Sequence, residues 1–249
     1  MCGICGCSKA SLEDINHQHQ HHQHLPHHAH TPHPSVVEVE ENLLKQNNQY
    51  AALNRDYFAA KALTAINLMS SPGSGKTTLL AKTISLLNQQ CSMSVVVGDQ
   101  QTDYDAEAIR LSGGKAIQIN TGHVCHLDAH AVGHAVEDLS LNKPGIVFLE
   151  NVGNLVCPAL FDLGEQARVV ILSVTEGENK PVKYPDMFHH ADLIILTKID
   201  LLPYVDFDMD SAMDFIQRVN PGVTMMALSA KTGEGLQAWI DWLLLQQAQ

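Results

Sequence analysis

The chain has few basic residues for its size. Among 249 residues there are 15 lysines and arginines against 27 aspartates and glutamates, so the formal net charge is −12. Nucleic-acid binding needs a basic face toward the phosphates, and this balance argues against such a partner. No run of about eighteen apolar residues occurs, so the sequence offers no membrane span. The first residues, MCGICGC, also lack the basic start and apolar stretch of a signal peptide. These absences predict a cytoplasmic protein with no membrane partner.

The chain contains six cysteines. Because thiols stay reduced in the cytoplasm, these residues fit metal ligands or buried thiols better than disulfides. Cys2, Cys5 and Cys7 form a C-x-x-C-x-C motif whose thiolates can converge on one soft or borderline ion. If Met1 is removed, the terminal amine would complete a set of three sulfurs and one nitrogen, which suits Ni²⁺. The alternative is a reactive tail with no metal role.

Histidine is concentrated at the start of the chain. Residues 1–35 hold nine of the fifteen histidines and show almost no apolar periodicity. Such a stretch cannot bury enough surface to offset its ordering entropy, which predicts a disordered, metal-binding tail. The run is irregular and internal, which favours a flexible store for Ni²⁺, Zn²⁺ or Cu²⁺ over an engineered tag. Apolar residues at helical spacing predict a helical lead-in over 36–63, followed by the main domain at 64–249.

In the main domain, short apolar runs alternate with helical patterns. The strands are predicted at 65–69, 94–98, 116–119, 146–149, 169–174, 193–196 and 223–227. The helices are predicted near 77–87, 106–111, 128–139, 208–219 and 236–245. This alternation predicts an α/β fold of the Rossmann-like P-loop NTPase type, with a mostly parallel sheet flanked by helices.

A phosphate-binding loop is predicted where the first apolar run ends and a helical pattern begins. Residues 70–77 read SSPGSGKT, a P-loop in which Ser70 replaces the usual first glycine. That glycine shapes the turn, whereas the later glycines let backbone N–H groups converge on phosphates. Lys76 would reach the β- and γ-phosphates, and Thr77 would hold Mg²⁺. The loop residues expected to bind the nucleotide are Gly73, Ser74, Gly75, Lys76, Thr77 and Thr78.

A second motif indicates that the base is guanine. Residues 197–200 read TKID and resemble the N-K-x-D motif of GTPases, with Thr197 in place of asparagine. The Asp200 carboxylate can accept hydrogen bonds from the ring N–H and exocyclic amine of guanine, a pattern that adenine does not offer. The stem of Lys198 would pack over the base. Ser229, Ala230 and Lys231 would complete the base-side loop. An ATPase of the same fold class is the alternative.

Two acidic residues end predicted strands on the phosphate side. Glu150 begins the sequence ENVG and is predicted to hold Mg²⁺ or its waters, while Gly153 lets the backbone respond to the γ-phosphate. Asp99 is interpreted as a second carboxylate on the Mg²⁺ side and as the candidate that positions the attacking water. With Lys76, these two residues form the predicted catalytic set. The alternative for Asp99 is a turn or helix-capping residue.

A second candidate metal site consists of Cys125, His126 and Cys157. Two sulfurs and one imidazole form an incomplete tetrahedral set, open to water or to a ligand from a second subunit. Cys157 lies in the segment expected to respond to the γ-phosphate. If the three residues meet, hydrolysis would change the metal affinity. Cys91 is interpreted as an inert core thiol. The remaining histidines are interpreted as surface or satisfied core residues: His123, His130, His134, His189 and His190.

Residues 65–246 resemble the G domain of the HypB family, GTPases that help to insert nickel into nickel–iron hydrogenase. The matching stretches are 70–78, 98–102, 120–122, 125–129, 150–158, 174–188 and 197–204. The N-terminal C-x-x-C-G-C motif and the histidine-rich stretch also resemble the longer members of that family. Thr197 departs from the asparagine that the family usually carries.

The resemblance implies a P-loop GTPase of the SIMIBI class, which forms a nucleotide-dependent homodimer and has low intrinsic activity. It implies a tight metal site at the three N-terminal cysteines and a weaker one at Cys125, His126 and Cys157, near the dimer contact. The cargo would be Ni²⁺, received by a hydrogenase large-subunit precursor with the help of a second nickel accessory protein. Two alternatives stay open: a GTPase chaperone for a urease or cobalamin enzyme, and a nickel or zinc storage protein.

Overall fold

The computed structural model describes residues 36–141 and 143–248. The described chain forms a seven-stranded parallel sheet in the order β3-β2-β4-β1-β5-β6-β7. Its strands are β1 (Leu63–Ser70), β2 (Ser92–Asp99), β3 (Lys115–Asn120), β4 (Gly145–Glu150), β5 (Ala167–Ser173), β6 (Leu193–Thr197) and β7 (Thr224–Leu228). Every residue of the central strands β1 and β4 is buried, which explains why these strands read as continuous apolar runs rather than alternating ones.

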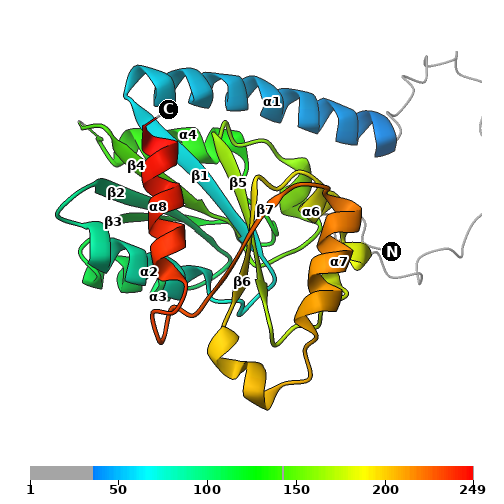
Figure 1. Cartoon of the computed structure of the whole chain (residues 1–249). Coiled ribbons are helices and arrows are strands. Elements are labelled where there is room, and N and C mark those ends of the chain that lie inside the picture. The colour runs from blue at the N-terminus through cyan, green and yellow to red at the C-terminus, as the bar shows by residue number, and fades with distance from the viewer. Residues whose placement is uncertain (1–35, 142, 249) are drawn as a thin grey trace, which may run out of the picture.

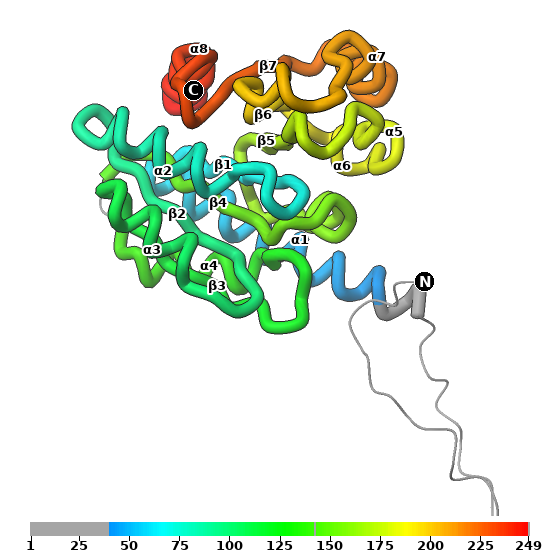
Figure 2. The backbone as a smooth tube through the Cα atoms, turned by 90° about the horizontal axis from the view of Figure 1, so that it is seen from below, coloured from blue at the N-terminus to red at the C-terminus, as the bar shows by residue number. Residues whose placement is uncertain are grey.

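Helices cover both faces of the sheet. They are α1 (Val36–Ala60), α2 (Lys76–Leu87), α3 (Tyr104–Leu111), α4 (Ala129–Asp138), α5 (Lys180–Lys183), α6 (Pro185–His189), α7 (Met209–Val219) and α8 (Leu236–Gln247), with 3₁₀ turns η1 (Cys157–Leu160) and η2 (Ile199–Tyr204). One core cluster packs α2, α3 and α8 against one face of the sheet. On the opposite face, a second cluster contains α1 and α4, and a third contains α6 and α7. Figure 2 shows α8 and α7 on opposite sides of β7. The predicted α/β fold with a parallel sheet between helices is confirmed.

The predicted lead-in helix is α1, which lies across the top of the sheet beside α4 (Figure 1). Buried asparagines fix it there. The Asn54 amide donates to the carbonyls of Ala129 (2.7 Å) and Leu163 (3.0 Å). Asn47 accepts from the backbone N–H of Ala129 and donates to the carbonyl of Asp162. Because these bonds reach the start of α4 and the loop before β5, α1 is held against the sheet domain along much of its length.

The predicted strands and longer helices all occur, whereas four short elements were not predicted. η1, α5, α6 and η2 are four to six residues long and contain prolines, so they carry no 3.6-residue apolar period that could announce them. The prediction of a disordered tail over 1–35 lies outside the described residues. None of the described helices is long and apolar enough to cross a membrane.

Candidate nucleotide and metal site

The predicted P-loop connects the buried end of β1 to the first turn of α2. Gly73 and Gly75 have φ values of 72° and 101°, in the left-handed region that glycine adopts without steric cost. Gly75 is the N-cap of α2, so the free N–H groups of that helix face the loop. The Lys76 ammonium donates to the Ser70 hydroxyl over 2.8 Å. The serine that replaces the usual glycine therefore holds the lysine that is predicted to bind phosphate.

Burial shapes the electrostatics of the phosphate side. Desolvation lowers the pKa of Lys76, and the nearby charge of Glu150 opposes that shift. Burial raises the pKa of Glu150 to about 7, against the bond from Thr77 and the charge of Lys76. The Thr77 hydroxyl donates to one Glu150 oxygen over 2.6 Å, while the other oxygen is buried with no partner among the described residues. A hydroxyl and an unsatisfied carboxylate oxygen side by side fit the hard oxygen ligands that Mg²⁺ prefers.

A cavity of about 530 Å³ lies beside the P-loop and Glu150, and it is called the phosphate cavity below. Asp99 lines this cavity and also forms hydrogen bonds within its own loop. Its carboxylate accepts from the backbone N–H of Gln100 and from the hydroxyl of Thr102 (2.6 Å), which is the turn role considered as the alternative. Asp105 is a lining residue that the sequence analysis missed. It lies in the first turn of α3, and its charge acts on Lys76 and on Glu150. A helical pattern alone gave no sign that this carboxylate would face the phosphate cavity.

Thr197 and Lys198 connect the base side to the phosphate loop. The Thr197 hydroxyl donates to the Ser74 carbonyl over 2.7 Å, and the Lys198 ammonium donates to the Gly73 carbonyl over 2.6 Å. Threonine can thus supply, with its hydroxyl, a tie between the two loops where the usual motif has an asparagine amide.

Four of the five predicted base-side residues line one cavity of about 220 Å³: Lys198, Asp200, Ala230 and Lys231. One oxygen of Asp200 accepts from the Ser229 hydroxyl over 2.6 Å, which orients the carboxylate. The other carboxylate oxygen has no hydrogen bond described here and can accept from a base. The cavity is lined by Ser74, Gly75, Thr78, Thr197, Lys198, Asp200, Leu201, Ala230 and Lys231.

The structure brings Cys125, His126 and Cys157 together. Their ligand atoms lie within 4.8 Å of one another, and the two sulfurs are 2.8 Å apart. His126 is 9% exposed, its ring stacks on Phe161 with centroids 3.8 Å apart, and its Nδ1 has no partner among the described residues. Desolvation lowers the pKa of His126, against the charge of Asp128, so the imidazole is neutral near pH 7 and able to bind a metal. Two sulfurs and one imidazole suit Ni²⁺ or Zn²⁺.

The segment after β4, residues 150–157, runs from the phosphate cavity to this cluster. A Cβ on Gly153 would lie 2.8 Å from the Cα of Pro72, so this segment packs directly on the P-loop. Farther along, the Asn154 amide donates to the carbonyl of Cys125 over 3.4 Å. The same short segment therefore contacts the P-loop through Gly153, bonds the loop of Cys125 through Asn154, and ends at Cys157.

The other sulfur and imidazole groups lie elsewhere. Cys91 is 5% exposed, and burial raises the pKa of its thiol, which agrees with an inert core residue. His130 and His134 lie on the exposed face of α4, with their Nε2 atoms 3.2 Å apart. The predicted site at Cys2, Cys5 and Cys7 lies outside the described residues.

A parallel sheet with a P-loop after a central strand and a TKID loop beside it defines a P-loop nucleotide-binding protein of the GTPase type. The profile "CobW/HypB/UreG, nucleotide-binding domain" matches residues 64–227. The chain belongs to this family and, within it, to the HypB hydrogenase maturation factors.

Relatives that are 51–55% identical to the chain carry the name "Hydrogenase maturation factor HypB". The chain is 55% identical over 212 residues to "Hydrogenase maturation factor HypB" of Azotobacter chroococcum, which covers 85% of this chain and 70% of the relative. It is 51% identical to the protein of the same name from Escherichia coli, over 85% and 73% of the two chains. The crystal structure of HypB from Helicobacter pylori in complex with nickel matches with a TM-score of 0.78 and 36% identity, over 82% of this chain and 95% of that one.

We expect Glu150 to make the nucleotide-free chain less stable as the pH rises. Burial raises the pKa of its carboxyl to about 7 in the folded chain, whereas in the unfolded chain the pKa has its ordinary value of 4.5. The folded state therefore binds more protons between these values, and roughly 3 kcal/mol of stability is lost as the pH rises through that window. Glu150→Gln should remove this loss, measured by urea unfolding at about pH 5 and about pH 8. The exposed Glu107→Gln is the control, and an unchanged pH dependence in Glu150→Gln would contradict the prediction.

Thr197→Val should weaken guanine-nucleotide binding. Valine keeps the shape but leaves the Ser74 carbonyl without its donor, a loss of about 1 kcal/mol or roughly fivefold in affinity. Titration with a fluorescent GDP analogue measures the change. Thr224→Val, on the exposed start of β7, is the matched control and should bind GDP like the unsubstituted chain. Equal affinities in both variants would show that the Thr197 hydroxyl does not tie the two loops in the bound state.

Proposed function

We propose that this chain is a GTP-hydrolysing metallochaperone that delivers Ni²⁺ into a nickel–iron hydrogenase precursor. One observation carries the proposal: the cluster of Cys125, His126 and Cys157 lies at the far end of a segment that starts at Glu150 in the phosphate cavity. Two features of the relatives support nickel as the cargo. Relatives that are 51–55% identical are named hydrogenase maturation factor, and the HypB of Helicobacter pylori was solved in complex with nickel.

The reaction would be GTP + H₂O → GDP + phosphate, by in-line attack of water on the γ-phosphate. Lys76 and the N–H groups at the start of α2 would stabilise the charge on the phosphates. The Thr77 hydroxyl and Glu150 would hold Mg²⁺, which neutralises phosphate charge when bound. Asp99 would orient the water from its place in the cavity wall, which also contains the carboxylates of Asp105 and Glu150. None of these groups needs to form a covalent intermediate.

The preference for guanine would come from Asp200. Its carboxylate can accept from both the ring N–H and the exocyclic amine of guanine, whereas adenine presents an acceptor at the matching ring position. Ser229 orients the carboxylate, and Lys198 crosses the cavity between the base and the phosphate loop.

The metal cluster would be completed by a second copy of the chain. Three ligands leave one tetrahedral position open. Val156 and Leu160, which flank Cys157, are 56% and 51% exposed, an apolar margin that favours a protein contact beside the metal. A homodimer that forms with nucleotide bound would bury this margin and let the nucleotide state govern Ni²⁺ or Zn²⁺ affinity.

The remaining parts of the proposal concern the start of the chain and its surroundings. Cys2, Cys5 and Cys7 would form a tighter metal site, and the histidine-rich stretch would keep a reserve of Ni²⁺ or Zn²⁺ in the cytoplasm. A second nickel accessory protein and the hydrogenase large-subunit precursor would be the partners.

Asp200→Asn should abolish the preference for guanine. An amide presents a donor to the guanine ring N–H, and the expected loss of GTP affinity is at least about tenfold. Competition of unlabelled GTP and ATP for a bound fluorescent GDP analogue measures it, and only GTP should compete in the unsubstituted chain. Asp210→Asn, exposed in the first turn of α7, is the control. Equal competition by GTP and ATP in the unsubstituted chain would identify an ATPase instead.

The proposed function is tested in a strain that lacks this protein. Reintroducing the chain should restore hydrogenase activity and leave urease activity as it was. If the chain restored urease activity and not hydrogenase activity, it would be a chaperone for urease instead. Lys76→Ala should fail to restore hydrogenase while binding Ni²⁺ like the unsubstituted chain, because it removes a phosphate contact and no metal ligand. Full maturation by Lys76→Ala would contradict a GTP-driven chaperone and favour a storage protein.

A further inference from the structure

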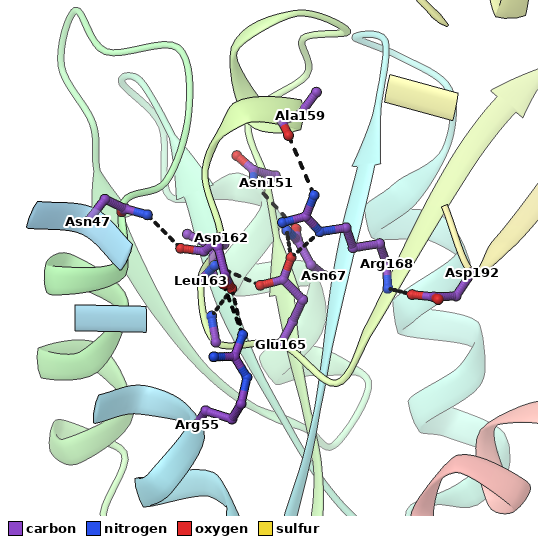
Figure 3. Close-up of polar contacts among 11 residues, drawn as sticks. Asn47, Arg55, Asn67, Asn151, Ala159, Asp162, Leu163, Glu165, Arg168 and Asp192 are labelled. Atoms are coloured by element: carbon purple, nitrogen blue, oxygen red, sulfur yellow. Dashed lines mark hydrogen bonds and ion pairs between the residues drawn. The ribbon is translucent and has the colours of Figure 1, made fainter. Parts of the chain in front are cut away.

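Glu165 is a buried carboxylate that contacts neither the nucleotide cavity nor the metal cluster. It lies in the loop between η1 and β5, and its side chain is 3% exposed. One oxygen accepts from Arg168 Nε over 2.7 Å and from the Asn67 amide over 3.3 Å, while the other accepts from the backbone N–H of Leu163 over 2.7 Å. Figure 3 shows the carboxylate between these partners. A buried carboxylate with both oxygens hydrogen-bonded holds its partners, and the segments that carry them, in one arrangement.

Arg168 connects this carboxylate to the turn that carries Cys157. Besides its bond to Glu165, the guanidinium donates to the carbonyl of Ala159, within η1, over 3.5 Å. The backbone N–H of Arg168 donates to Asp192, which anchors the start of β5 (Figure 3). Ala159 also packs in the apolar core beside residues of β1, β5 and β6, so the guanidinium adds a polar link to a turn that already contacts the sheet.

Asn67 connects the same carboxylate to the other half of the cluster. Its side-chain oxygen accepts from the Asn151 amide over 3.4 Å (Figure 3). Asn151 in turn accepts from the backbone N–H of Leu127 over 3.0 Å, next to His126. Asn67 and Asn151 are 0% and 1% exposed, so this path is closed to water.

Glu165 thus stands at the point where two hydrogen-bond paths meet. One passes through Arg168 to the turn of Cys157, and the other passes through the two asparagines to the loop of Cys125 and His126. A buried ion pair contributes little net stability, because desolvation offsets the attraction. Its effect is to hold segments in one arrangement. Partners behind metal ligands commonly change metal affinity by about 10- to 100-fold when they are removed.

We propose that Glu165, held by Arg168, is a positioning residue that sets Cys157 relative to Cys125 and His126 for metal binding. The inference rests on the metal site of the proposed function and adds two residues to its support. Glu165→Gln keeps the size of the side chain but turns one acceptor into a donor. An N–H would then face either Arg168 or the backbone N–H of Leu163, and one bond must break.

The test uses the full chain with Cys2, Cys5 and Cys7 replaced by serine, under reducing conditions, titrated with Ni²⁺ alone. In this background a thiolate-to-nickel charge-transfer band can arise only from the cluster, because Cys91 is buried and histidines give no such band. Glu165→Gln should weaken the Ni²⁺ affinity read from that band by about 10- to 100-fold and shift the band. GDP affinity should change by less than about twofold, because Glu165 lies outside the nucleotide cavity.

Arg218→Ala is the matched control. Arg218 pairs with Asp214 on the exposed side of α7, and neither residue contacts Glu165 or Arg168 among the described residues. The control should keep the Ni²⁺ affinity and the band. A second variant, Arg168→Lys, keeps the positive charge, yet one ammonium cannot reproduce the fork between Glu165 and Ala159. It should also shift the band, and it carries the test if Glu165→Gln does not fold.

Three results would overturn the proposal. One is a band and affinity in Glu165→Gln and Arg168→Lys equal to those of Arg218→Ala. Another is a fall in melting temperature in both variants with the band unchanged, which would make the ion pair a structural support only. The third is a band that survives replacement of both Cys125 and Cys157 by alanine, which would show that the metal is not bound at this cluster and would remove the proposed metal site as well.

Discussion

The parallel pairing of β1 with β4 places Leu68 opposite Glu150, and the functional geometry depends on that register. The carboxyl ends of parallel strands lie at the same edge of a sheet. The P-loop, which follows β1, and the segment that follows β4 therefore begin next to each other. The backbone N–H of Asn151 still bonds the Leu68 carbonyl, which extends the pairing one residue past the strand. From there Gly153 packs on the P-loop, and the chain reaches Cys157 within a few residues. The P-loop is therefore close, along one short segment, to Cys157, the proposed metal ligand.

The chemistry around this register uses hydroxyls where related motifs use other groups. Ser70 replaces a glycine and accepts the Lys76 ammonium, while Thr197 replaces an asparagine and reaches the Ser74 carbonyl. In both places a small polar side chain on a buried strand end donates or accepts one bond, so the departures from the usual motifs keep the loops connected.

Much of this site could be predicted from the sequence because its signals are local. A glycine-rich loop between a strand and a helix, or an Asp after a strand in TKID, has a spacing that the chemistry itself requires. The meeting of Cys125 with Cys157 could only be a hypothesis, since it depends on two loops brought together by the sheet. Asp105 and Glu165 left no signal. Each is an acidic residue in an ordinary stretch, and only tertiary packing shows that one borders the phosphates and the other lies buried behind the metal cluster. The position of α1 on the sheet could not be predicted either, because it depends on long-range bonds from Asn47 and Asn54.

We propose that nucleotide state and metal binding are coupled through residues 150–157. By linkage, a metal that prefers one nucleotide state must change the relative affinity for the two nucleotides by the same factor. The most direct measurement is the affinity of the chain for GDP and for a non-hydrolysable GTP analogue, each with and without Ni²⁺, in the unsubstituted protein and in Cys157→Ala. If the two are coupled, Ni²⁺ should change the ratio of the two affinities by about tenfold, a coupling of about 1.4 kcal/mol, and Cys157→Ala should abolish the change. A ratio that Ni²⁺ leaves unchanged would contradict the coupling.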